Sequence, residues 1–288
     1  MPFYPKSVTN RVEEVDFLRG IAIVFMVIFH WYVLYDLRHG TSTLGHPVLT
    51  VLGFVARVLF IFLVGVATAL AQQKAQLRED NGEQDEREFL RRQYRRVGYL
   101  ALYALLVTLV TAWVYPDVYV RFGILHYMAV ALALLTLFAY KPQTIGKTLP
   151  LVVGLVMYFV HHSVKNTVSY NYASQFIMGY LPHYGTMDYF PLFKWFWLTA
   201  LGLFVGQSLF KKAQPIYTSL EVGENMVGKG LVTLGKYSLE IYLTHFVVIY
   251  GVQQMMGLVA NIPNHDSASK RGRVIALQHR FFIKKVCA

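Results

Sequence analysis

Residues 48–71 read VLTVLGFVARVLFIFLVGVATALA, a stretch in which Arg57 is the one charged side chain. About 20 apolar residues are enough for a helix to cross the hydrocarbon core of a bilayer. A segment inside lipid must satisfy its backbone hydrogen bonds internally, and a single segment can do so as a helix. The stretch therefore predicts a transmembrane α-helix.

Further apolar runs follow along the chain, and the last is less pure because it contains Glu240 and His245. They span residues 17–35, 97–115, 122–140, 149–161, 189–210 and 231–259. The composition agrees, since 15% of the 288 residues are charged, against about 25% in soluble domains. We predict an all-α fold, a polytopic transmembrane helix bundle of about seven spans, with a range of six to eight.

Lysine and arginine accumulate in the cytoplasmic loops of membrane proteins, so their positions predict orientation. The segment between the second and third runs is the most basic, with Lys74, Arg78, Arg87, Arg91, Arg92, Arg95 and Arg96. We expect this loop in the cytoplasm, which also places the N-terminus inside. Residues 261–288 are basic as well, although seven crossings would put them outside. We expect a membrane domain at 1–260 and a poorly ordered tail at 261–288.

The net charge of +11 is explained by this topology, and basic edges of this kind attract anionic lipid headgroups and anionic cofactors. The sequence has no nucleic-acid-binding motif, so we expect no nucleic-acid partner. Cys287 is the one cysteine, which excludes an intrachain disulfide and a thiol nucleophile in the body of the chain. We expect no metal site, because the paired His161 and His162 are too few ligands.

The first run carries the most informative ionisable residues, because charged groups inside spans are costly and mark functional sites. Arg19 and His30 are eleven residues apart, which puts them on one helix face about 16 Å apart. Histidine suits a general base, since its pKa lies near operating pH. The structural alternative is that Arg19 reaches the interface and that His30 bonds a neighbouring helix.

Other ionisable residues in the runs are weaker candidates. A lone arginine inside a span needs a partner, and for Arg57 the possible partners are Glu240, an anionic ligand or backbone carbonyls. His126 begins the fourth run, either near an acceptor site or simply at the interface. Glu240 and His245 lie about 140° apart around a helix, so we expect them on different faces.

The residues Asp16-x-x-Arg19-Gly20, followed by an apolar helix and His30, resemble the opening of membrane acyltransferases, and Arg-x10-His resembles a motif of the type-3 family. Later motifs resemble bacterial relatives of the catalytic domain of heparan-alpha-glucosaminide N-acetyltransferase. These motifs are FIFLVG at 60–65, FGILH at 122–126, DYFPL at 188–192, GKYSL at 235–239 and IYLTH at 241–245. One departure is Lys194, which stands where the family usually has proline before the tryptophan.

This resemblance implies an enzyme of the bacterial inner membrane that uses cytoplasmic acetyl-CoA as its donor. The enzyme would transfer an acetyl or acyl group to an amine or hydroxyl of a glycan or amino-sugar acceptor, at or across the membrane. The partners would be the lipid bilayer, acyl-CoA and that acceptor, with the oligomeric state open. The candidate site residues are then His30 and His126 for catalysis, Asp16 and Arg19 for the CoA donor, and, more weakly, His39, Asp188 and His245 for the substrate. Arg57 joins the CoA-binding candidates because of its place inside a span and not because of the resemblance.

Two other classes stay open. A transporter without chemistry of its own would use Arg57 and Glu240 as a charged path, but the sequence has neither an inverted repeat nor a pair of broken helices. A structural membrane subunit would use its polar residues to hold helices together. Serine hydrolases and ATP-driven pumps are disfavoured, because the Gly-x-Ser-x-Gly and P-loop motifs are missing.

Overall fold

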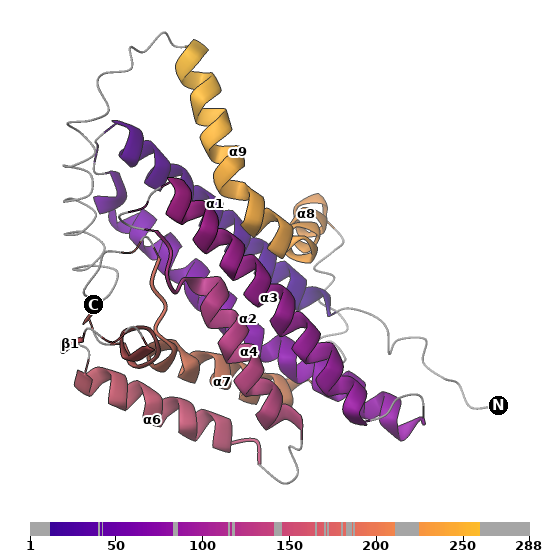
Figure 1. Cartoon of the computed structure of the whole chain (residues 1–288). Coiled ribbons are helices and arrows are strands. Elements are labelled where there is room, and N and C mark those ends of the chain that lie inside the picture. Colours follow the sequence, from indigo (N-terminus) through magenta and orange to yellow (C-terminus); the bar gives the residue numbers. More distant parts are fainter. Residues whose placement is uncertain are drawn as a thin grey trace. The chain divides into compact units, whose positions relative to one another are not determined.

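The structure is a computed structural model, and it describes residues 12–39, 41, 43–82, 86–114, 116, 119–140, 146–164, 166–169, 171, 173–179, 181–182, 186, 188–210 and 225–259. The predicted tail at 261–288 lies outside the described residues, so its boundary stays a prediction. Within the described ranges nearly all regular structure is helical, which confirms the predicted all-α fold (Figure 1).

Eight α-helices are found in the part of the chain that the structure describes. They are α1 (Glu13–His39), α2 (Pro47–Asp80), α3 (Glu86–Val114), α4 (Ile124–Tyr140), α6 (Leu149–Val164), α7 (Leu192–Leu209), α8 (Met226–Lys236) and α9 (Ser238–Val259). Helices α1, α2, α3 and α7 are long and apolar enough to cross a membrane, and α4 and α6 are shorter apolar helices. The chain is therefore a polytopic helical membrane protein.

The last predicted run differs from the structure. The sequence predicts one span over residues 231–259, whereas the chain is divided at Tyr237 into α8 and α9. Glycines at 228, 230 and 235 weaken helix formation before the break, and Ser238 is a residue type favoured at helix starts. Helix α8 has 11 residues, so its length of about 16 Å is too short to cross a bilayer.

The basic segment between the second and third runs is also different from the expected loop. Helix α2 continues to Asp80 and α3 begins at Glu86, so most of this segment is helical. Glutamine, glutamate and arginine dominate it, and all three are good helix formers. Glu88 and Arg92 form an ion pair one turn apart within α3, which supports the helix further.

The chain divides into two compact units, which are described separately. The first unit contains residues Met1–Val15 and Phe60–Glu221, and the second contains Asp16–Leu59 and Val222–Ala288. The first unit includes most of α2 together with α3, α4, α6 and α7. The second includes most of α1, the beginning of α2, and α8 and α9.

Within the first unit, α2 and α7 approach closely through small residues. Gly65 and Ala69 on α2 meet Gly202 and Gly206 on α7, and each pair is separated by three residues. A Cβ atom at Gly202 would overlap the Phe62 carbonyl oxygen, and one at Gly65 would overlap the backbone of α7. This small-xxx-small spacing lets two membrane helices pack backbone to backbone.

Glutamine side chains form hydrogen bonds between α2 and α7 at one end of the same crossing. The Gln207 Nε2 atom donates to Gln72 Oε1 at 2.9 Å, and both side chains are buried. Gln73 Nε2 donates to the Gly206 carbonyl at 3.2 Å. Interhelical amide bonds of this kind hold membrane helices in register.

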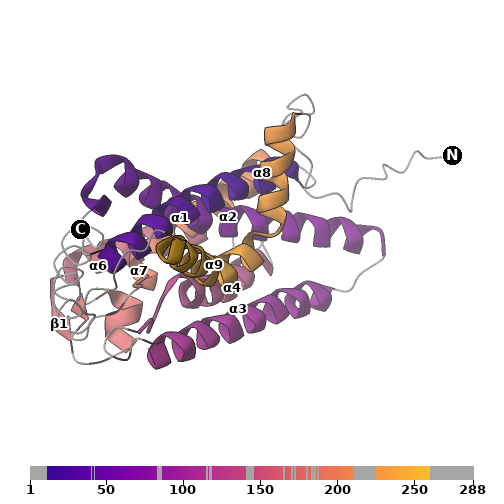
Figure 2. The same ribbon diagram turned by 90° about the horizontal axis from the view of Figure 1, so that it is seen from above.

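The remaining helices of the first unit pair with their sequence neighbours. Helices α3 and α4 lie side by side, as do α6 and α7 (Figure 2). Gly154 on α6 lets the backbone of Trp197 on α7 come close. Between these two helices, the chain forms a π-helix at Ser174–Met178 and two short paired strands, β1 (Val168–Ser169) and β2 (Leu181–Pro182).

In the second unit, α1 packs against α8 through two glycines. A Cβ atom at Gly20 would overlap the carbonyl of Leu231, and one at Gly235 would overlap the carbonyl of Asp16. Glycine is required at both positions because backbone occupies the space that a side chain would need. The contact places the start of α1 beside the end of α8.

Candidate active site

Two predicted site residues of the second unit are in direct contact. His245 Nε2 lies 3.2 Å from His30 Nδ1, and the ring centroids are 4.9 Å apart. His245 is 4% exposed, and His30 is half-buried. Gln253 Nε2 also donates to the Trp31 carbonyl at 2.9 Å. The packing of α9 against α1 therefore brings together two histidines that are distant in the sequence.

The hydrogen bonds give this histidine pair a direction. The Tyr242 carbonyl lies 2.5 Å from His245 Nδ1, and a carbonyl oxygen accepts but never donates, so this nitrogen carries the proton. In the neutral ring, His245 Nε2 is then an acceptor, and His30 Nδ1 must donate to it. His30, whose ring N–H also hydrogen-bonds the Met26 carbonyl, then keeps the lone pair of Nε2.

Aromatic rings and a positive charge surround His30. The Phe29 and Phe246 rings lie 5.4 Å and 4.8 Å from it, centroid to centroid. Arg57 donates from Nε to the Gly53 carbonyl at 3.2 Å, and its charge lies within electrostatic range of His30. The second unit thus places two other predicted site residues, His245 and Arg57, near the His30 imidazole.

Asp16 and Arg19 form an ion pair at the start of α1. Arg19 Nη1 lies 3.3 Å from Asp16 Oδ1, one turn away on the same helix. The Asp16 side chain is 4% exposed, whereas that of Arg19 is 27% exposed. The buried carboxylate therefore anchors a guanidinium that still reaches the surface, and a guanidinium in this state can bind a phosphate group.

The far end of α1 holds His39 and a residue that the sequence did not single out. His39 Nδ1 donates to the Tyr35 carbonyl at 2.9 Å, and the two rings stack. Asp36 is buried and accepts hydrogen bonds from Thr41 Oγ1 at 2.5 Å and from the Thr43 amide at 3.0 Å. Asp36 therefore closes the turn between α1 and α2, and its sequence signal is a lone acid followed by two threonines.

His126, in the first unit, has both ring nitrogens engaged. The Gly123 amide donates to its Nδ1 at 3.3 Å. Thr108 Oγ1 donates its proton to the Val120 carbonyl at 2.8 Å, so it accepts from His126 Nε2 at 3.2 Å. This histidine fastens the start of α4 to α3, and its predicted meeting with His30 stays a prediction.

Asp188 acts on the same end of α4. Its Oδ2 atom accepts from the Ile124 amide at 2.9 Å, one of the amides that lack a partner at a helix start. A Cβ atom at Gly123 would overlap the Asp188 carboxylate, so the glycine allows this approach. The carboxylate thereby caps α4 from a segment more than sixty residues away.

The predicted site residues thus fall into two groups. His30, His245 and Arg57 gather in the second unit, which also contains Asp16, Arg19 and His39, whereas His126 and Asp188 lie together in the first. Glu240, considered as a partner for Arg57, is exposed. It therefore lies in a different environment from the buried His245, as the helical spacing predicts.

The fold and the contacts within it define a polytopic helical membrane protein with ionisable side chains packed between its helices. The family profile described as heparan-alpha-glucosaminide N-acetyltransferase, catalytic, matches residues 11–247. This match spans most of the chain, so the protein belongs to that family, and the family implies an acyltransferase. Searches of curated proteins and of solved structures gave no significant match.

Proposed function

We propose that this protein transfers an acetyl or related acyl group from cytoplasmic acyl-CoA to an amine or hydroxyl of a sugar at or across the membrane. The observation that carries the proposal is the directed hydrogen bond from His30 to His245, because it leaves one defined nitrogen of His30 ready to accept a proton. Family membership supports the acyl-transfer chemistry, and the long apolar helices support a location in the membrane.

In the proposed reaction, His30 Nε2 takes the proton of the acceptor as its nitrogen or oxygen attacks the thioester carbonyl. The new bond to the acyl carbon forms, the carbon–sulfur bond breaks, and the proton passes from His30 to the departing thiolate. The positive charge formed on His30 is stabilised by its Nδ1–H bond to His245. General acid–base catalysis of this kind contributes about 10²–10⁴-fold to the rate.

The cationic residues of the second unit have separate roles in this proposal. Arg57 stabilises negative charge that develops on the acyl carbonyl oxygen, as preorganised donors do in acyl-transfer enzymes. Arg19, held by Asp16, binds a phosphate of CoA at the inner end of α1, on the side where the proposed orientation places the N-terminus. His39 contributes more weakly to binding of the acceptor at the other end of the helix.

In this proposal, His126 and Asp188 of the first unit have a positioning role, because they hold the start of α4. Both ring nitrogens of His126 are already hydrogen-bonded, so neither is open for proton transfer. His126 therefore assists by holding the start of α4 in place. Asp188 holds the same helix end through the Ile124 amide. The proposal therefore assigns proton transfer to His30 alone.

The test is CoA release from acetyl-CoA by the purified full-length protein with a panel of amino sugars. The His30→Ala variant is expected to lose about 100-fold or more in kcat. The His162→Ala variant, which removes an exposed histidine of α6, is expected to behave as the wild type. Absence of turnover with every acceptor, or equal turnover by both variants, would overturn the proposal.

A covalent route would use the same lone pair, with His30 Nε2 taking the acyl group from CoA before the acceptor arrives. A rapid-quench experiment with radiolabelled acetyl-CoA and no acceptor separates the two routes. Label retained on the wild-type protein and absent from His30→Ala indicates the covalent route, and CoA release that requires the acceptor indicates direct transfer.

A further inference from the structure

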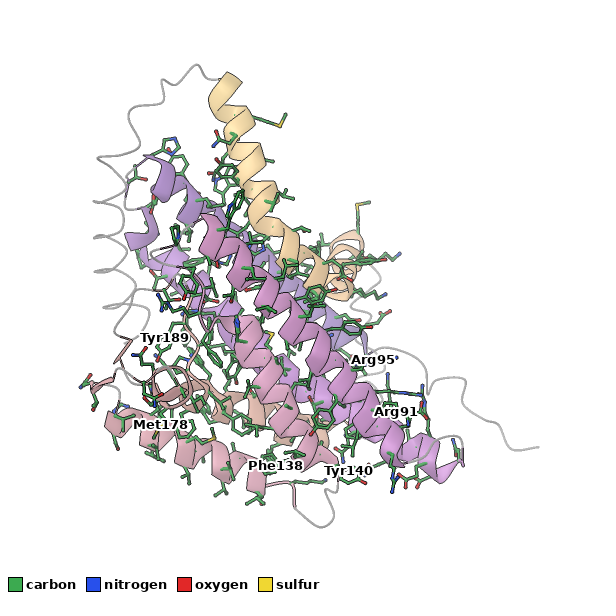
Figure 3. All side chains as sticks on the ribbon, viewed as in Figure 1. Arg91, Arg95, Phe138, Tyr140, Met178 and Tyr189 are labelled. Atoms are coloured by element: carbon green, nitrogen blue, oxygen red, sulfur yellow. The ribbon has the colours of Figure 1, made fainter. Side chains whose placement is uncertain are left out.

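The first turns of α3 carry two kinds of arginine. Arg87, Arg91 and Arg95 are spaced by four residues and exposed, so they follow one another along one side of the helix. Among the described residues, none of the three forms a hydrogen bond or an ion pair. Figure 3 shows Arg91 and Arg95 projecting from this stretch of α3. We refer to these three residues as the arginine stripe.

The neighbouring arginines of the same helix are already engaged. Arg92 forms an ion pair with Glu88, and Arg96 donates to the buried Gln93 at 3.4 Å. They are turned by about 100° from the stripe positions that precede them. Arg92 and Arg96 therefore have partners within α3 although they also reach the surface, whereas the three stripe residues have none among the described residues.

The arginine stripe continues into a surface that suits lipid tails. The side chains of Leu102, Leu106 and Leu109 are more than half exposed, and Trp113 is 86% exposed. Helical geometry places them within about 40° of Arg95 around the axis. Leucines that expose this much area on a membrane protein face the hydrocarbon of the bilayer.

The length of this surface sets the depth of the stripe. Arg95 and Trp113 are separated by about 27 Å along the helix axis, close to the thickness of about 30 Å of a bilayer core. Tryptophan and tyrosine are enriched at both boundaries of that core, and on α3 Trp113 lies towards one end of the apolar surface, with Tyr94 and Tyr99 towards the other. Arg95 and Arg91 then fall at the level of the headgroups, with Arg87 at their outer edge.

We infer that Arg87, Arg91 and Arg95 bind the phosphates of anionic lipid headgroups and so fix the depth of α3 in the membrane. A guanidinium binds phosphate through two parallel hydrogen bonds, and each basic residue near an anionic surface strengthens binding about fivefold. The inference depends on the membrane character of the chain and not on its proposed reaction.

The test measures which lipids the full-length protein retains. The purified protein is exchanged into mixed micelles of phosphatidylcholine and phosphatidylglycerol, re-isolated, and its bound lipids are quantified by mass spectrometry. The wild type is expected to enrich phosphatidylglycerol. The variant Arg91→Gln/Arg95→Gln is expected to lose up to about 30-fold of that preference, and Arg91→Lys/Arg95→Lys is expected to retain part of it.

The matched control is Arg92→Gln/Arg96→Gln, which removes the same charge from adjacent positions of the same helix. It is expected to lose less of the lipid preference than the stripe variant, because Arg92 is already paired with Glu88 and Arg96 with Gln93. Equal losses in the two double glutamine variants would show that only net charge matters and would overturn the inference. No loss in either variant would also overturn it. Weaker binding of CoA by the stripe variant, with its lipid preference unchanged, would assign the stripe to the CoA donor instead.

Discussion

The chemistry of His30 depends on which of its ring nitrogens holds the proton. The Tyr242 carbonyl fixes the proton on His245 Nδ1, and His245 in turn fixes it on His30 Nδ1. A histidine that is oriented by a second group follows the same logic as the base of a catalytic triad, where loss of the correct tautomer is costly. His245 is therefore a positioning residue in the proposed reaction.

This role predicts a graded response at position 245. His245→Ala is expected to lower kcat about tenfold to 100-fold with little change in KM for acetyl-CoA, because His30 keeps its place but loses its orientation. His245→Gln is expected to retain more activity, since its amide oxygen can accept from His30 Nδ1. Steady-state kinetics on both variants gives the measurement. A change in KM alone would show that His245 binds substrate and does not orient His30.

Sequence reasoning reached part of this site. The spacing of Arg19 and His30 and the separation of Glu240 from His245 follow from helix geometry alone. The contact between His30 and His245 does not, because it depends on how α9 packs against α1 and on the bond from Gln253 to the Trp31 carbonyl. The cap that Asp188 provides to α4 was hidden for the same reason, since it joins segments far apart in the chain.

At the scale of helices, the apolar runs predicted the positions of six helices, of which four are long enough to cross a membrane. The requirement for internal backbone bonding leaves a helix as the one solution for such runs. The prediction from apolar runs failed over residues 231–259, where composition suggested one span and local backbone preference divided the segment. Tyr237 follows Gly235, and that glycine is held against the Asp16 carbonyl. A hydropathy average does not register such a contact.

The crossing of α2 and α7 gives a prediction at the same scale. Gly202→Leu is expected to destabilise the protein by about 3 kcal/mol or more, because its side chain would have to displace the backbone near Phe62, and overpacking of this kind costs about 1–3 kcal/mol even when the core can adjust. The measurement is the thermal unfolding midpoint in detergent. Gly98→Leu on α3 is the control, since a Cβ at Gly98 meets nothing within 4 Å. Equal midpoints for the two variants would contradict the close crossing.

For the molecule as a whole, the proposed chemistry depends on orientation. Acyl-CoA is made in the cytoplasm, so Arg19 can bind its phosphates if the start of α1 faces that side. The basic ends of α2 and α3 predict this orientation through the positive-inside rule, and the arginine stripe uses the same side of the membrane. A single reversal would therefore remove the donor from the proposed site and the stripe from the cytoplasmic leaflet.

Cysteine labelling tests that orientation, because Cys287 is the one native cysteine and can be replaced by serine. Asn81→Cys, at the exposed end of α2, is expected to react with a membrane-impermeant maleimide in inside-out vesicles and to be protected in right-side-out vesicles. His46→Cys, exposed between α1 and α2, is expected to show the opposite pattern, because one helix crossing separates the two positions. If both labels reverse, the N-terminus lies outside and Arg19 cannot bind cytoplasmic acyl-CoA, whereas the same side for both would mean that α2 does not cross the membrane.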